Sequence, residues 1–194
     1  MITGANSYIA TGLVPASSYQ LRLRSQNTGG SSPNSNILNV STINIEPIAQ
    51  PAALSFGNLA SNGVSLSFSG ATGTPDGYIV IYKAGSAPMD LPVDGISYTA
   101  GDAIGSSTVG YSGSSKDILI LGLTSGLDYY FKIYSFNGGS NTTNFLPTNP
   151  LEGNITILSS EPASQPTDLI FDNVATNNVE LKFTAPTLTP AGYI

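Results

Sequence analysis

The sequence predicts an all-β chain built from tandem β-sandwich modules, and three observations support that prediction. Short apolar runs are separated by turn-forming residues, with 21 Gly and 13 Pro among 194 residues, as expected of strands joined by turns. Several runs alternate apolar and polar residues with a period of two, which is the pattern of a half-buried strand. A long segment also recurs along the chain, which indicates that one structural unit is used more than once.

The repeat begins at two Glu-Pro pairs. Residues 46–79 (EPIAQPAALSFGNLASNGVSLSFSGATGTPDGYI) align without a gap at an offset of 115 with residues 161–194, and 18 of the 34 positions are identical. One module therefore begins near Glu46 and the next near Glu161.

The start of the chain matches the second half of the same unit. Residues 12–27 align with residues 122–137 at an offset of 110. After a loop that is five residues longer in the later copy, residues 39–41 align with residues 154–156 at an offset of 115. The opening strands of this chain therefore correspond to the closing strands of the complete module.

These alignments predict three parts. We expect residues 1–45 to form the C-terminal half of one module, residues 46–160 a complete module and residues 161–194 the N-terminal part of a third. The missing parts belong either to the same polypeptide or to another copy of the chain. In the complete module, the apolar residues that mark the predicted strands are, in chain order, Leu54, Phe56, Val64, Leu66, Phe68, Tyr78, Val80, Tyr82, Ile118, Ile120, Leu123, Tyr129, Phe131 and Ile133, followed by a last strand near residues 154–157.

The junctions between modules carry paired prolines. Pro47 and Pro51 lie four residues apart in the first junction, and Pro162 and Pro166 have the same spacing in the second. Proline restricts the backbone, so these segments are predicted to be stiff and extended. Modules joined in this way should stand end to end.

The spacing of leucine and tyrosine resembles that of a fibronectin type III module. Leu123 and Tyr129, like Leu13 and Tyr19, are six positions apart and are followed by alternating apolar residues. The resemblance implies an immunoglobulin-like sandwich in which the tyrosine hydroxyl bonds to nearby backbone while its ring fills the core. It also implies that Phe68 takes the place of a core tryptophan that this chain lacks.

The repeat departs from that family in its length. A long insertion, residues 84–116, follows the third predicted strand, so the repeat reaches 115 residues. Its Pro-Val-Asp-Gly and Gly-Asp-Ala-Ile-Gly segments are similar to long fibronectin-like repeats in secreted and surface proteins of bacteria that use type IX secretion. This similarity implies an extracellular or cell-surface location.

Composition excludes several functions. With a formal charge of −6 and a sequence pI of about 4.2, the chain is a poor partner for nucleic acid, and no apolar run is long enough to span a bilayer. The absence of His and Cys removes the usual nucleophile pairs and zinc sites. We therefore expect no enzyme activity and no cofactor.

The acidic residues of the insertion leave one chemical alternative open. Asp94 and Asp102 could act as a carboxylate pair, or with Asp90 could bind calcium, but their neighbouring glycines favour turn formation. Three further residues, Asn39, Asn141 and Asn154, begin Asn-x-Ser/Thr sequons. Such sequons accept glycans in a eukaryotic secretory pathway and are incidental in a bacterial protein.

The sixth predicted strand has apolar residues on both faces. If Tyr129, Phe131 and Ile133 face the core, the opposite face carries Tyr130 and Tyr134. Residues of the candidate surface are Tyr130, Tyr134, Phe136, Ile79 and Ile81. Either the insertion covers this face, or the face binds a protein or glycan ligand.

The favoured interpretation is a non-catalytic structural or adhesive spacer in a large extracellular or cell-surface bacterial protein. Neighbouring modules of the same chain or of another copy would be its first partners. The alternatives are an accessory region of a secreted hydrolase and a carbohydrate-binding module in which Tyr130 and Tyr134 stack on sugars.

Overall fold

The computed structural model describes residues 6–60, 62–158, 164–186 and 192. The chain divides into two compact units, Met1–Leu158 and Ser159–Ile194. Apart from one short 3₁₀ helix, η1 (Ser140–Thr142), all regular elements of the described residues are strands. The all-β prediction is therefore confirmed.

Strands of the first unit fall into two groups along the chain. Residues before the first junction form β1 (Ser18–Leu21), β2 (Gln26–Asn27), β3 (Gly30–Ser31) and β4 (Leu38–Ser41). The complete module contains β5 (Ala52–Ala60), β6 (Gly63–Ser69), β7 (Gly77–Ala84), β8 (Ala103–Ile104), β9 (Ser107–Gly113), β10 (Asp117–Leu121), β11 (Asp128–Asn137), β12 (Asn144–Phe145) and β13 (Leu151–Thr156). The second unit contains β14 (Thr167–Val174) and β15 (Val179–Thr184).

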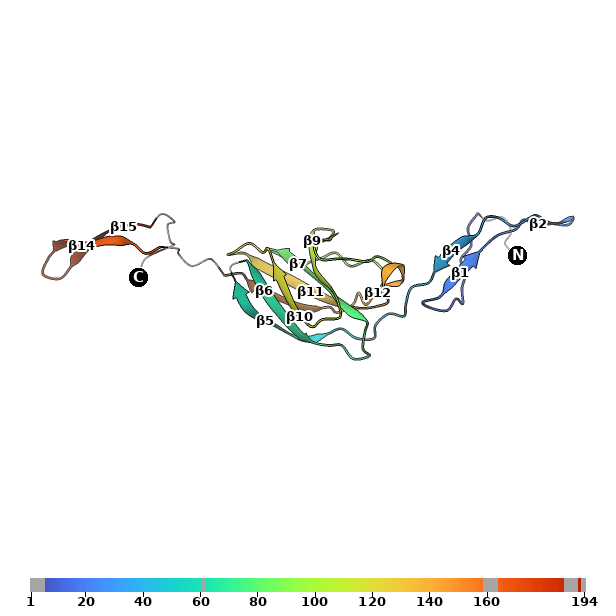
Figure 1. The fold of residues 1–194 in the computed structure, drawn as a ribbon, viewed down its shortest axis with the longest axis horizontal. Helices are drawn as coiled ribbons and strands as arrows, with labels where there is room; N and C mark the ends of the chain where they lie inside the picture. The colour runs from blue at the N-terminus through green and yellow to red at the C-terminus, as the bar shows by residue number, and fades with distance from the viewer. Residues whose placement is uncertain (1–5, 61, 159–163, 187–191, 193–194) are drawn as a thin grey trace. The chain divides into compact units, whose positions relative to one another are not determined.

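The complete module is a sandwich of two antiparallel sheets (Figure 1). The smaller sheet has the order β10-β6-β5, and the larger runs β11-β7-β9-β8. Two short strands, β12 and β13, share the remaining edge of β11. The chain starts in the smaller sheet with β5 and β6, passes to the larger sheet for β7 to β9, returns for β10 and ends in the larger sheet. Such crossing between two packed sheets is typical of an immunoglobulin-like sandwich.

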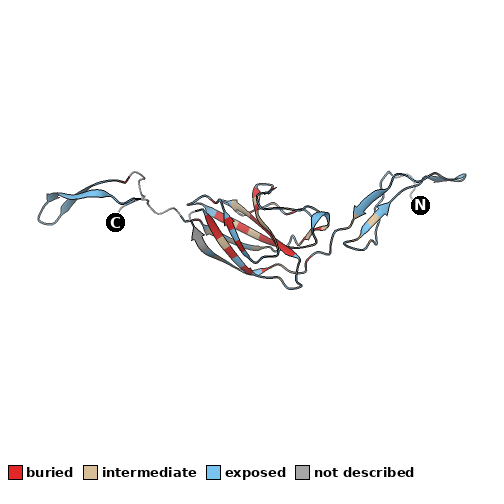
Figure 2. Cartoon of the chain, viewed as in Figure 1, coloured by how far each residue is buried: buried red, intermediate tan, exposed pale blue. Residues whose placement is uncertain are grey.

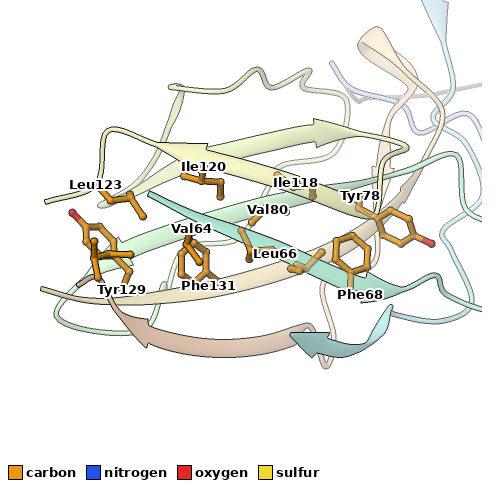
Figure 3. Packing of buried hydrophobic residues seen from close by; sticks show 12 residues of the cluster. Val64, Leu66, Phe68, Tyr78, Val80, Ile118, Ile120, Leu123, Tyr129 and Phe131 are labelled. Carbon is orange, nitrogen blue, oxygen red and sulfur yellow. The ribbon is translucent and has the colours of Figure 1, made fainter. Parts of the chain in front are cut away.

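The core lies between the two sheets, and its residues occupy every second position of β6, β10 and the first part of β11. Figure 2 shows that the buried positions of the chain gather on the strands of the complete module. Figure 3 shows Val64 and Leu66 from β6 facing Val80 and Phe131 from the opposite sheet. Phe68 occupies the place predicted for a large aromatic residue, with its ring edge-on to Tyr78 at a centroid distance of 5.1 Å. The apolar residues that mark the predicted strands form this core, with Leu54, Phe56 and Tyr82 partly buried at its margin.

The tyrosine corner is present in both copies of its motif. In the complete module the Thr124 N–H donates to the Tyr129 hydroxyl oxygen at 3.0 Å. In the opening segment the Val14 N–H donates to the Tyr19 hydroxyl at 2.8 Å. The backbone bond implied by the fibronectin resemblance is therefore confirmed at both positions.

The first hairpin repeats the register of the last two strands of the complete module. Tyr19 pairs with Val40 in β1 and β4, and Tyr129 pairs with Ile155 in β11 and β13. The remaining pairs match at the same alignment offsets, so equivalent residues of the two segments pair in the same way.

The second unit repeats the first two strands of the module. Phe171 pairs with Leu181 in β14 and β15, as Phe56 pairs with Leu66 in β5 and β6. Leu181 is 50% exposed, whereas Leu66 is 1% exposed. The difference arises because, among the described residues of this unit, the hairpin has no facing sheet to cover it.

Candidate functional site

The outer face of the larger sheet is the candidate surface. Its three central side chains, Ile79, Ile81 and Tyr134, have no exposed area. Tyr134 pairs directly with Ile79 across β11 and β7. These side chains form a second hydrophobic core, separate from the one between the sheets.

The insertion contributes to this second core, partly from β8 and β9 of the same sheet and partly from the segment that precedes them. Ile104 and Val109 are buried within the second core, and Tyr98 packs against it. Burial of each large apolar side chain contributes roughly 1.5–3 kcal/mol, so the layer stabilises the module substantially. Ile79, Ile81 and Tyr134 are therefore buried in this structure, as the cover interpretation expects, and a part for these three in ligand binding stays a prediction.

Two residues of the candidate surface are only partly covered. Tyr130 and Phe136 are half-buried, and the Phe136 ring packs against Phe145 at a centroid distance of 5.6 Å. A role for Tyr130 or Phe136 in binding stays a prediction. Neither residue is part of a continuous exposed aromatic platform, because Tyr134 between them is buried.

Sequence reasoning did not identify Phe145 as part of the cover. Phe145 is 3% exposed and belongs to β12, within the loop that is longer in the complete module than in the first repeat. Its ring also packs against Tyr98 of the insertion at a centroid distance of 6.0 Å. The five extra residues of this loop were the available signal, since they allow an aromatic side chain to reach the outer face.

Burial affects the ionisation of Tyr134. Desolvation, together with the nearby negative charge of Glu152, raises the pKa of Tyr134 to about 12. Glu152 itself forms an ion pair with Lys132 across β13 and β11 at 2.9 Å. Tyr134 is therefore neutral at physiological pH and acts in this site as an apolar core residue.

A small pocket lies beside the aromatic residues of the second core. Its volume is about 130 Å³, and Tyr98, Phe136 and Phe145 contribute to its lining. Pockets that enclose small-molecule ligands usually measure about 300–1,000 Å³. The pocket is too small to enclose such a ligand.

The three acidic residues of the insertion each hold a different piece of backbone. The Asp94 carboxylate accepts the Phe145 N–H at 2.8 Å. The Asp90 carboxylate accepts the N–H of Ser106 at 3.0 Å, and the Asp102 carboxylate accepts that of Thr99 at 2.7 Å. The turn interpretation fits these bonds, and within the described residues no group of three or more acidic side chains could hold a metal ion.

Replacing Asp94 with alanine should loosen the cover. The buried N–H of Phe145 would lose its acceptor, which costs about 1–3 kcal/mol in comparable cases. We expect a lower denaturation midpoint and faster proteolysis within the insertion. Asp102→Ala is the matched control, because it removes a carboxylate from an exposed turn and should change stability by at most about 0.5 kcal/mol. Equal effects of the two substitutions would contradict a specific role for Asp94.

The three sequon residues lie at separate places in the sequence and on different elements. The sequon residues Asn39, Asn141 and Asn154 are all exposed, on β4, η1 and β13. Among the residues described by the structure, no helix is long and apolar enough to cross a membrane.

The first junction is bonded to the complete module, which paired prolines alone did not reveal. The Asn44 N–H donates to the Thr142 carbonyl at 2.8 Å, and the side-chain amide of Asn144 donates to the Asn44 carbonyl at 2.7 Å. One residue further along, the Ile45 carbonyl accepts from the Asn137 side chain at 2.9 Å. The first junction, called the linker below, is therefore held by Asn137 at the end of β11 and by residues of the loop that follows that strand.

No protein-family model and no curated protein matches this sequence. Solved structures similar to the chain include fibronectin type III domains. They include domains FN1–FN3 of chicken CNTN1, with 18% identity, coverage of 74% of this chain and 44% of that one, and a TM-score of 0.42. A two-domain segment of chicken tenascin has 20% identity, coverage of 78% and 71%, and a TM-score of 0.40.

A fibronectin type III domain of human collagen XX is a third similar structure, with 17% identity, coverage of 60% of this chain and 99% of that one, and a TM-score of 0.38. The fold assignment itself rests on the two-sheet strand order and the tyrosine corner of this chain.

Proposed function

We propose that this chain is a non-catalytic spacer segment of a large extracellular or cell-surface bacterial protein. Its modules would hold other domains at a set distance from the surface or from each other. The similarity of the insertion to long repeats of type IX-secreted proteins supports the bacterial and extracellular part of the proposal. The repeated strand register supports the tandem arrangement.

The observation that carries the proposal is the bonded junction. The N–H and carbonyl of Asn44 and the carbonyl of Ile45 are all hydrogen-bonded to the complete module. Pro47, two residues further along, is buried. A flexible linker would leave these groups to solvent. A linker that is part of the module surface transmits position from one module to the next, which is what a spacer requires.

The carbohydrate-binding alternative is weakened by the buried side chain of Tyr134. Only Tyr130 of the predicted stacking pair keeps partial exposure. The accessory-region alternative places the same demand on these modules, because in a secreted hydrolase they would also space one domain from another.

Neighbouring modules, of the same polypeptide or of another copy, are the proposed partners. Residues 1–45 and 161–194 together lack counterparts of residues 80–110 at the observed offsets. In the complete module that stretch includes most of β7, which joins β11 to β9. A sandwich assembled from these two parts would therefore lack the central strand of its larger sheet.

A reporter placed at the end of the chain tests the spacer proposal. The full chain is fused between a membrane anchor and a fluorescent domain, and the height of that domain above a supported bilayer is measured. A Gly/Ser linker of the same length serves as the control, because it behaves as a coil whose span grows only with about the square root of residue number. We expect a greater mean height and a narrower distribution for the chain, whereas matching distributions would contradict the proposal.

A further inference from the structure

The last strand of the complete module is interrupted. β12 and β13 pair with the same edge of β11, with Phe145 opposite Phe136 and Leu151 opposite Ile133. Between them the chain leaves the sheet, so the middle of β11 has no continuous partner strand on that side. The buried Ser135 lies opposite this gap. Its carbonyl accepts the Leu146 N–H at 3.0 Å, but its own N–H has no backbone acceptor in β12 or β13.

A side chain from the linker fills that gap. The side-chain carbonyl oxygen of Gln50, Oε1, accepts the backbone N–H of Ser135 at 2.8 Å. The amide nitrogen of Gln50 donates to the carbonyls of Leu146 at 2.6 Å and Thr148 at 3.0 Å. A side-chain amide offers the same acceptor and donor groups as a peptide unit. Gln50 therefore takes the place of the strand residue that is missing beside β11.

The position of Gln50 connects this bond to the linker. Gln50 lies directly before the buried Pro51, three residues after the buried Pro47. Its side chain bonds at the middle of β11, whereas Asn44 and Ile45 bond near the end of that strand. The linker is thus anchored at two separate places on one module.

We infer that the Gln50 side chain fixes the linker between modules in one position, a role called the lock below. Its binding site is the interrupted edge of β11 in its own module. This inference rests on the proposed spacer function, because a fixed joint matters only if position is transmitted. The repeat places Gln165 at the corresponding point of the next junction. A lock of the same kind is therefore expected wherever a complete module follows this linker sequence.

The chemistry of the lock predicts which substitutions break it. Gln50→Glu keeps the length and an acceptor oxygen but removes the two N–H donations to Leu146 and Thr148. Gln50→Asn keeps the amide but is one methylene too short to reach both partners. Gln50→Ala removes the side-chain bonds altogether. Gln165→Ala is the matched control, because Gln165 is the same residue in the same motif and is exposed in this chain.

A spin label in the linker tests the inference on the full chain. The chain contains no cysteine, so a single Glu46→Cys substitution at an exposed linker position is labelled alone. We expect a slowly moving label in the parent chain, at least a tenfold faster motion with Gln50→Ala or Gln50→Glu, and no change with Gln165→Ala. Amide exchange of Ser135 should accelerate at least tenfold in the same Gln50 variants, while exchange of Val80 in the core stays slow and shows that the module is folded.

The possible results of these experiments distinguish failure of the Gln50 inference from failure of the spacer proposal. A slow label in every variant, with unchanged exchange at Ser135, would overturn the lock and leave the spacer proposal standing. A mobile label in the parent chain would count against both. If Gln50→Ala unfolds the module, as loss of protection at Val80 would reveal, Gln50→Asn provides the milder test with the same two readouts.

Discussion

Replacing Tyr129 with alanine is expected to lower the free energy of unfolding of the complete module by about 3–5 kcal/mol, the range for truncating a large buried aromatic residue. Tyr129 is 6% exposed, its ring packs against Tyr82 at a centroid distance of 5.9 Å, and its hydroxyl accepts the Thr124 N–H. The substitution removes the packing and leaves that N–H without its partner. Denaturant unfolding of the full chain, followed by amide exchange in β7 and β11, measures the loss.

Two companion substitutions divide this effect into parts. Tyr129→Phe keeps the ring and removes only the hydroxyl, so it should cost about 1 kcal/mol, the usual net contribution of one hydrogen bond. Tyr19→Ala removes the same corner from the first hairpin, where the tyrosine is only half-buried, and should leave the complete module unchanged. An unaltered midpoint for Tyr129→Ala would show that the corner does not hold the sandwich together.

Replacing Tyr134 with alanine should destabilise the module to a similar extent, again by about 3–5 kcal/mol. Tyr134 is fully buried on the outer face of the larger sheet, among Ile79, Ile81 and Phe145. Its removal would leave a cavity beneath the insertion. The insertion should then become more accessible to protease, in addition to the lower midpoint of denaturation.

Tyr130→Ala is the control for this second prediction. Tyr130 lies on the same strand but is only half-buried, so its loss should cost clearly less than that of Tyr134. A binding surface would give the opposite order, with Tyr134→Ala harmless to stability and harmful to ligand binding. Equal and small effects of both substitutions would contradict a second core.

Much of the fold could be predicted from local pattern and internal repetition. Val64, Leu66 and Phe68 alternate with serines, and that alternation alone indicates which side of β6 faces the core. The repeat alignment makes Tyr19 and Val40 equivalent to Tyr129 and Ile155, and the structure pairs the residues of both sets across neighbouring strands. The corner tyrosines could be identified in the same way, since their hydroxyls bond only five residues back along the chain.

The outer face could not be settled in advance. Tyr134 and Ile79 suit a buried layer and an exposed binding surface equally well, because both require apolar side chains. The choice depended on whether the insertion and Phe145 reach this face. The answer depends on the conformation of loops, and loop sequences carry no periodic hydrophobic pattern from which that conformation could be predicted.

By itself, the sequence determined that this chain repeats an all-β unit, with a leucine–tyrosine spacing typical of a tyrosine corner and with no His or Cys. These properties follow from alternation, spacing and composition, which act between neighbours or identical copies. Only the tertiary structure decided that the apolar outer face is a second core and that Gln50 closes a gap beside Ser135. Those two residues are 85 positions apart, and their bond exists because the interruption between β12 and β13 leaves a buried N–H that requires an acceptor.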